Sequence, residues 1–167
     1  LGIDCSGLVY YTLTQLGYST SGFSWNNPVP VDTAHWLTVS DSCTITYNGV
    51  TSKVDVEKAN IKTTDRPYWE CSDGSTITPG SVVVAENPGG IDHAWIYMGE
   101  FDSRSDVVSY LKSIGVSESL ITSSTVGDGT GAGGTHWRIE SNGSQGVVIN
   151  NNTDGKTATA MNMYAFR

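Results

Sequence analysis

Cys5 lies in the run Asp-Cys-Ser-Gly-Leu-Val, directly before an apolar segment with helical spacing. The dipole and unpaired N–H groups of a helix N-terminus stabilise negative charge, so they favour the thiolate form of a cysteine placed there. The thiolate is the nucleophilic form, and the small neighbours Ser6 and Gly7 leave room for a substrate beside the sulfur. Cys5 is therefore a candidate nucleophile. Two alternatives are a packing residue in the core and one half of a disulfide.

A cysteine nucleophile needs a base, for which histidine is the usual residue. His93 lies at the start of a predicted strand, just after a glycine turn, and such a position holds a side chain at the edge of a sheet. His136 opens a second predicted strand, and His35 lies in a segment expected to form a short helix or loop. A single histidine is more often structural than catalytic, so the residues alone leave all three open.

Two segments resemble the NlpC/P60 family of papain-like cysteine peptidases. Residues 4–18, DCSGLVYYTLTQLGY, are similar to the family's nucleophile motif, and residues 78–100, TPGSVVVAENPGGIDHAWIYMGE, are similar to its histidine block. The resemblance implies a papain-like α+β domain with Cys5 as nucleophile and His93 as base. It also implies a secreted or cell-surface bacterial enzyme without a cofactor. Its expected substrate is an amide bond in a peptidoglycan stem peptide, typically one next to D-γ-glutamyl.

The third catalytic residue of that family lies a few residues before a segment similar to QGVVI, residues 145–149. This alignment places it on Glu140. A carboxylate there would accept the ring N–H of the histidine, fix its tautomer and stabilise the imidazolium. His136 is the alternative, since a residue four positions away on a strand lies on the same face. The alignment favours Glu140.

Four residues are candidates for substrate contact: Ser6, Asp92, Trp36 and Trp137. Both tryptophans are adjacent to a histidine and are expected to line a groove, whereas Trp95 is expected in the core. The histidines and Cys5 form no close-spaced pair of the HxxxH or CxxC kind, so no metal site is predicted.

The sequence contains three cysteines, an odd number. Cys43 and Cys71 lie in polar, turn-rich segments and would form a disulfide if the protein is exported, which would leave Cys5 as the free thiol. The alternative is that all three are reduced. If Cys43 and Cys71 pair, the disulfide role of Cys5 is removed, and the packing role is then the weakest of the three interpretations.

Length and charge limit the class of partner. The 167 residues fit one domain, residues 1–167, and the formal net charge is −8 with only 9 Lys and Arg. Binding to nucleic acid or to an anionic membrane surface depends on clustered basic residues, so neither partner is expected. No apolar run approaches the roughly 20 residues of a membrane helix. Because the chain begins inside a motif, we expect a domain excised from a larger protein, whose other domains would be partners.

The predicted elements form an α+β domain in which the helix carrying the nucleophile packs on a small antiparallel sheet. A helix is predicted over residues 5–17, with Asp4 as its N-cap, and a hairpin over residues 44–56 turns at Asn48-Gly49. Insertions relative to the family are expected at about 41–72 and 102–134. The second contains an amphipathic helix near 103–115 and a flexible glycine-rich loop at 126–134. Further strands are predicted at 81–86, 92–101, 135–141, 145–150 and 158–167.

The resulting hypothesis is a cysteine endopeptidase that acts on peptidoglycan through Cys5, His93 and Glu140 and a thioester acyl-enzyme. Two alternatives belong to other functional classes. One is a catalytically silent cell-wall-binding or adhesion module. The other is an acyltransferase or transpeptidase in which the same triad passes the acyl group to an amine.

Overall fold

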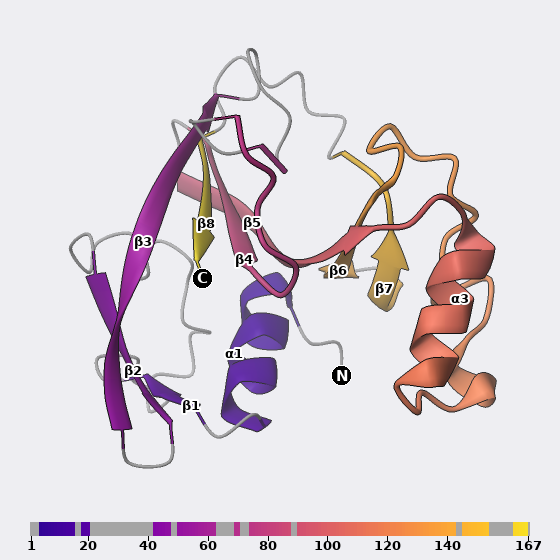
Figure 1. Cartoon of the computed structure of the whole chain (residues 1–167), viewed down its shortest axis with the longest axis horizontal. Coiled ribbons are helices and arrows are strands. Elements are labelled where there is room, and N and C mark those ends of the chain that lie inside the picture. Colours follow the sequence, from indigo (N-terminus) through magenta and orange to yellow (C-terminus); the bar gives the residue numbers. More distant parts are fainter. Residues whose placement is uncertain are drawn as a thin grey trace.

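A computed structural model describes residues 4–15, 18–20, 42–47, 50–62, 69–70, 74–87, 90–142, 145–153 and 162–166. In these ranges the chain forms an antiparallel sheet of eight strands in the order β1-β2-β3-β8-β4-β5-β6-β7 (Figure 1). The helices are α1 (Cys5–Gln15), α3 (Arg104–Ser113) and the short 3₁₀ helix η1 (Glu118–Leu120). The strands are β1 (Tyr18–Thr20), β2 (Ser42–Tyr47), β3 (Val50–Lys62), β4 (Val82–Asn87), β5 (Gly90–Glu100), β6 (His136–Asn142), β7 (Gly146–Asn150) and β8 (Asn162–Phe166).

The two longer helices pack against different parts of the sheet. Helix α1 packs on β5 and β6 and also contacts β1, whereas α3 lies beyond β6 and β7 (Figure 1). The prediction of a mixed α+β fold, with an N-terminal helix on an antiparallel sheet, is confirmed. Strands β1–β3 form one end of the sheet, and β3 joins them to β8.

The first residues of α1 are fixed by the cap that the sequence predicts. The carboxylate of Asp4 accepts the backbone N–H of Gly7 at 2.5 Å, and its carbonyl accepts the N–H of Leu8 at 2.9 Å. The first bond satisfies an N–H group that has no partner inside the helix, and the second is the first backbone bond of the helix. Leu8 and Val9 are buried. The helix therefore has a defined start and a defined buried face, and together they set the position of Cys5.

The predicted hairpin is also confirmed. Tyr47 pairs with Val50 across the two-residue connection, as an Asn-Gly turn requires. Strand β3 continues past the hairpin and pairs with β8, so it joins the hairpin to the main sheet.

Strand register places a set of polar side chains on one face of the sheet. Trp95 of β5 pairs with Glu140 of β6, and Arg138 of β6 pairs with Asn150 of β7. Side chains alternate between faces along a strand, so His93, Trp95, Arg138, Glu140 and Asn150 all lie on the same face. Helix α1 packs on this same face of the sheet, as the hydrogen bond between its first residue, Cys5, and His93 shows.

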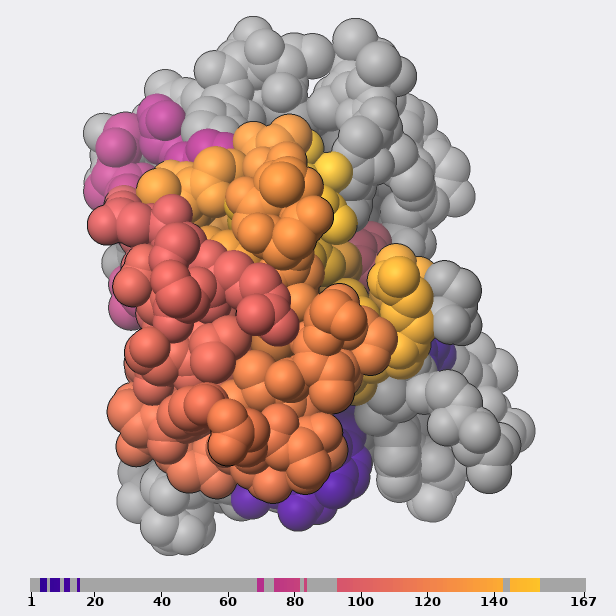
Figure 2. All heavy atoms as spheres, turned by 90° about the vertical axis from the view of Figure 1, so that its right-hand side faces the viewer, coloured from indigo at the N-terminus to yellow at the C-terminus, as the bar shows by residue number. Residues whose placement is uncertain are grey.

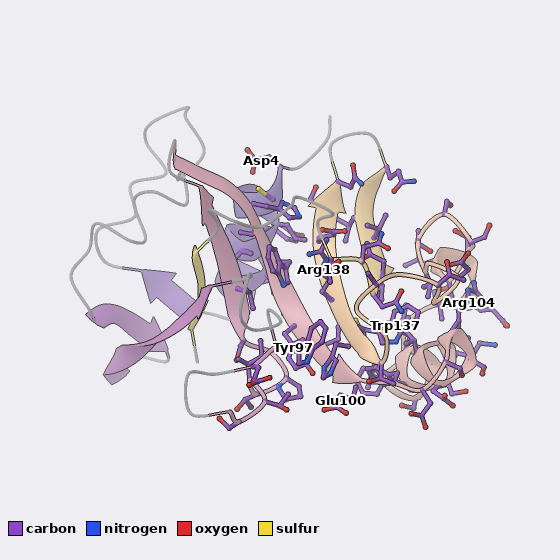
Figure 3. The ribbon with its side chains drawn as sticks, turned by 90° about the horizontal axis from the view of Figure 1, so that it is seen from above. Asp4, Tyr97, Glu100, Arg104, Trp137 and Arg138 are labelled. Atoms are coloured by element: carbon purple, nitrogen blue, oxygen red, sulfur yellow. The ribbon has the colours of Figure 1, made fainter. Side chains whose placement is uncertain are left out.

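Trp137 lies on the opposite face, which corrects its predicted place in a substrate groove. It is only 1% exposed and packs in a cluster with Val107 and Leu111 of α3 and with Val126. Its indole N–H donates to the carbonyl of Phe101 at 3.0 Å. Figure 3 shows Trp137 on the α3 side of the sheet, so its ring has no surface to offer a substrate. Trp95 is buried, as predicted.

The segment 102–134 forms a continuous surface over this end of the molecule (Figure 2). Its predicted amphipathic helix is α3, and its glycine-rich loop is fixed by Asn151 rather than flexible. The amide of Asn151 donates to the carbonyls of Gly129 and Gly134 and accepts the N–H of Gly131. A Cβ at Gly131 would lie 2.5 Å from the backbone oxygen of Asn151, so only glycine fits there.

We expect Gly131→Ala to lower the free energy of unfolding by about 2 kcal/mol, because the added methyl overlaps backbone that is itself held by hydrogen bonds. Urea denaturation measures this change. The neighbouring exposed substitution Ala132→Ser is the control, with an expected change within about 0.5 kcal/mol. Equal stability of the two variants would contradict the close packing of this loop on Asn151.

Candidate active site

Cys5 is the first residue of α1 and is a free, partly buried thiol. Burial raises the pKa of Cys5. Hydrogen bonds with the His93 side chain and the Ala94 backbone, together with the charge of His93, lower the pKa by more than burial raises it. The net pKa is below the ordinary value of a cysteine. The thiol therefore lies where its negative form is favoured, through His93 and the Ala94 backbone.

His93 connects the thiol to a carboxylate. Its Nε2 lies 2.6 Å from Oε2 of Glu140, and both side chains are largely buried. An ionised carboxylate can only accept a hydrogen bond, so Nε2 carries the hydrogen. In the neutral ring Nδ1 then holds the lone pair and is the nitrogen left to exchange a proton with Cys5. This is the tautomer that a general base for the thiol requires.

The Glu140 carboxylate has partners on both of its oxygens. Nη2 of Arg138 lies 2.9 Å from Oε2, and the Asn150 amide donates to Oε1 at 2.5 Å. Burial raises the pKa of Glu140, but the His93 hydrogen bond, the Arg138 charge and the Asn150 hydrogen bond outweigh it and lower the pKa to about 2. Glu140 is therefore ionised throughout the neutral range.

The N-terminus of α1 lies beside the point where β5 and β6 begin to pair. The ladder between these strands starts at Trp95 and Glu140, so Ala94 precedes it, and its backbone hydrogen-bonds to the thiol. In Figure 3, Asp4 marks the N-terminal end of α1 and the Arg138 label marks β6. The polar chain from Cys5 to Glu140 thus runs from the helix start across β5 to β6.

His136, the alternative third residue, lies elsewhere. Its Nδ1 is 2.8 Å from the hydroxyl of Tyr97, and its ring stacks on Trp69 with centroids 4.0 Å apart. Burial lowers the pKa of His136, and the negative charge of Glu100 opposes that shift. Tyr97 and Glu100 lie toward the far end of β5 (Figure 3). The structure brings Glu140, and not His136, to His93.

The other predicted site residues are only partly described. Ser6 lies in the first turn of α1 and Asp92 directly precedes His93 in β5. Cys43 lies in β2, paired with Val54. His35, Trp36 and Cys71 lie outside the described residues, so the disulfide and the groove role of Trp36 stay predictions.

Two residues of the site were missed by sequence reasoning. Arg138 could have been predicted from the sequence, because it lies two positions before Glu140 on the same strand and therefore on the same face. Asn150 could not, because its contact with Glu140 depends on how β7 pairs with β6.

None of the helices in the described ranges is long and apolar enough to cross a bilayer. The same ranges contain no group of three or more His, Cys, Asp or Glu side chains arranged to hold a metal ion.

The site has the parts of a nucleophilic centre: a thiol with a lowered pKa, a histidine beside it, and an ionised carboxylate behind the histidine. No family model, curated protein or solved structure matches the chain. The chemistry of this arrangement is consequently the basis for a functional proposal. It suits acyl transfer, in which a thiolate attacks a carbonyl carbon and an imidazole moves the proton.

Alkylation by iodoacetamide should detect the lowered pKa of Cys5. Because the thiolate is the reacting form, Cys5 should be alkylated at pH 6 at least about tenfold faster than in the His93→Gln variant, which lacks the partner that lowers the pKa. Mass spectrometry of the Cys5 peptide follows the rate without interference from other cysteines. His136→Gln is the matched control and should react like the parent protein. Equal rates in the His93→Gln variant would show that the pair does not form.

Stability below pH 5 should depend on Glu140. Its pKa is about 2 in the folded protein and ordinary in the unfolded chain, so its contribution is present above pH 5 and is lost as the pH falls through 2. The shift corresponds to about 3 kcal/mol. We expect urea denaturation at pH 5 and pH 2 to show this loss in the parent protein and not in Glu140→Gln. Asp102→Asn, at an exposed carboxylate, should keep the parent dependence.

Proposed function

We propose that this protein is a papain-like cysteine peptidase of the NlpC/P60 type that hydrolyses amide bonds in peptidoglycan stem peptides. The observation that carries the proposal is the chain of contacts from Cys5 through His93 to Glu140. The substrate class is supported by the resemblance of residues 4–18 and 78–100 to that family. Because such a substrate lies outside the cytoplasm, the proposal includes a secreted or cell-surface location in a bacterium.

In the first half of the proposed reaction, the Cys5 thiolate attacks the carbonyl carbon of the scissile amide. A carbon–sulfur bond forms, and the carbonyl electron pair moves to the oxygen. Backbone N–H groups at Cys5 or Ser6 would stabilise this oxyanion. The tetrahedral intermediate then collapses, the carbon–nitrogen bond breaks, and the His93 imidazolium gives its proton to the leaving amine. The product on the enzyme is a thioester.

In the second half, neutral His93 accepts a proton from water as the water oxygen attacks the thioester carbon. Collapse of the second tetrahedral intermediate breaks the carbon–sulfur bond and releases a carboxylic acid. Cys5 is left as thiolate and His93 as imidazolium, so the cycle consumes one water and balances. Glu140 stays ionised throughout, holds the ring by Nε2 and stabilises its positive charge.

The buried polar chain favours an enzyme over a silent wall-binding module. Burying an ionised carboxylate is costly unless it is paired and hydrogen-bonded, and Glu140 retains three such partners beside a free thiol. A binding module would gain nothing from a thiol with a lowered pKa. A transferase would use the same first half reaction and differ only in the acceptor of the acyl group.

Digestion of purified peptidoglycan tests the proposal. We expect the parent protein to release stem-peptide fragments with new amino termini, and Cys5→Ala to release none. Glu140→Gln should lower the rate by about 10²–10⁴-fold because the ring loses its charged partner, while His136→Gln should stay near the parent rate. Liquid chromatography with mass spectrometry measures the fragments. Release of fragments by Cys5→Ala at the parent rate would overturn the mechanism, and amide-linked products with added amines would indicate a transferase.

A further inference from the structure

We infer that Arg138 is a positioning residue of this site, because it binds the same Glu140 oxygen that holds His93 and places a buried positive charge behind the Cys5–His93 pair. The inference rests on the proposed function and deepens it. It assigns to Arg138 the task of setting the pH range over which the thiolate and imidazolium coexist.

The burial of Arg138 supports this role. Arg138 is 2% exposed, whereas arginine is almost never fully buried unless it is paired. A buried ion pair adds little stability, and apolar residues of similar volume often replace one without loss. Stability alone is therefore a poor reason for this guanidinium to lie in the sheet. Its position against a carboxylate of the proposed triad indicates a function that depends on charge.

The contacts that Arg138 makes support the same role. Nη2 of Arg138 and Nε2 of His93 both contact Oε2 of Glu140, at 2.9 and 2.6 Å. Asn150 holds Oε1, so the carboxylate is fixed from both sides. The Arg138 guanidinium lies over the ring of Trp95, 4.7 Å from its centroid, and the same indole lies 5.4 Å from the His93 ring. Trp95 thus packs against both of the side chains that contact Oε2.

The charged groups around Glu140 determine how the loss of Arg138 should affect the ionisation of Cys5 and His93. Cys5 and Asp4 face the site from α1, His93 from β5 and Arg138 from β6, while the contact from β7 is the uncharged Asn150. A fixed positive charge favours the deprotonated form of every titrating neighbour. Arg138 therefore favours the thiolate and restrains the proton affinity of the imidazole. Removal of Arg138 should therefore move both the ionisation of the Cys5 thiol and the loss of the imidazolium proton of His93 to higher pH.

The pH profile of Cys5 alkylation by iodoacetamide tests this role without any peptide substrate. In Arg138→Met, the acidic limb, which reports thiolate formation, and the alkaline limb, which reports loss of the imidazolium proton, should both move up by about one pH unit. Arg138→Lys restores the charge and should restore the parent profile. Lys112→Met is the matched control, because it removes one positive charge at an exposed residue on α3.

A profile of folded Arg138→Met that superimposes on the parent profile would overturn the inference. Circular dichroism and thermal unfolding establish that the variant is folded. Should Arg138→Met not fold, Arg138→Gln, which keeps a donor without the charge, is measured with the same expectation. A shifted profile in a protein that leaves peptidoglycan intact would refute the proposed substrate and keep the role of Arg138. Cleavage of peptidoglycan with an unshifted profile would refute the role of Arg138 alone.

Discussion

The hydrogen bond between His93 Nε2 and Glu140 Oε2 is the interaction on which the site depends, because it joins two strands and fixes the ring that contacts the thiol. It exists only in one register of β5 against β6. Side chains alternate between faces, so a slip of one residue would move Glu140 to the α3 side and bring Ile139 or Ser141 to its place opposite Trp95. The chemistry of the site is therefore set by strand pairing as much as by residue type.

Packing on the opposite face protects that register. Trp137 lies between Arg138 and His136 in sequence, and its indole is enclosed by α3 and Val126. Exposing it would cost several kcal/mol, about what is lost when a buried tryptophan is truncated to alanine. Asn151 adds a second restraint by fixing the glycine-rich loop next to Asn150. The segment 102–134 therefore supports the site from behind the sheet, although none of its described residues hydrogen-bonds to Glu140.

Alternation along strands also explains what the sequence could and could not predict. Cys5 and His93 have local signals, a helix start and a strand start, and the structure brings them together. Glu140 was predicted from the alignment of residues 145–149, and Arg138 follows from the two-residue period once β6 is recognised. Trp137 was judged by its adjacency to His136, but adjacent residues on a strand face opposite sides, so that reasoning placed it on the wrong face. The contact of Asn150 depends on pairing between strands, which a single sequence does not encode locally.

Groups of opposite charge are neighbours along the path from α1 into the sheet, so each buried charge at the site has a partner. Asp4 caps the helix and its negative charge raises the pKa of Cys5, which opposes thiolate formation at the place where it is needed. His93 offsets that effect directly. Arg138 contacts the same carboxylate oxygen as His93, so the negative charge of Glu140 is shared between a buried guanidinium and the histidine ring. In the proposed mechanism, Arg138 would limit how firmly the imidazolium beside Glu140 holds the proton that it passes to the leaving amine.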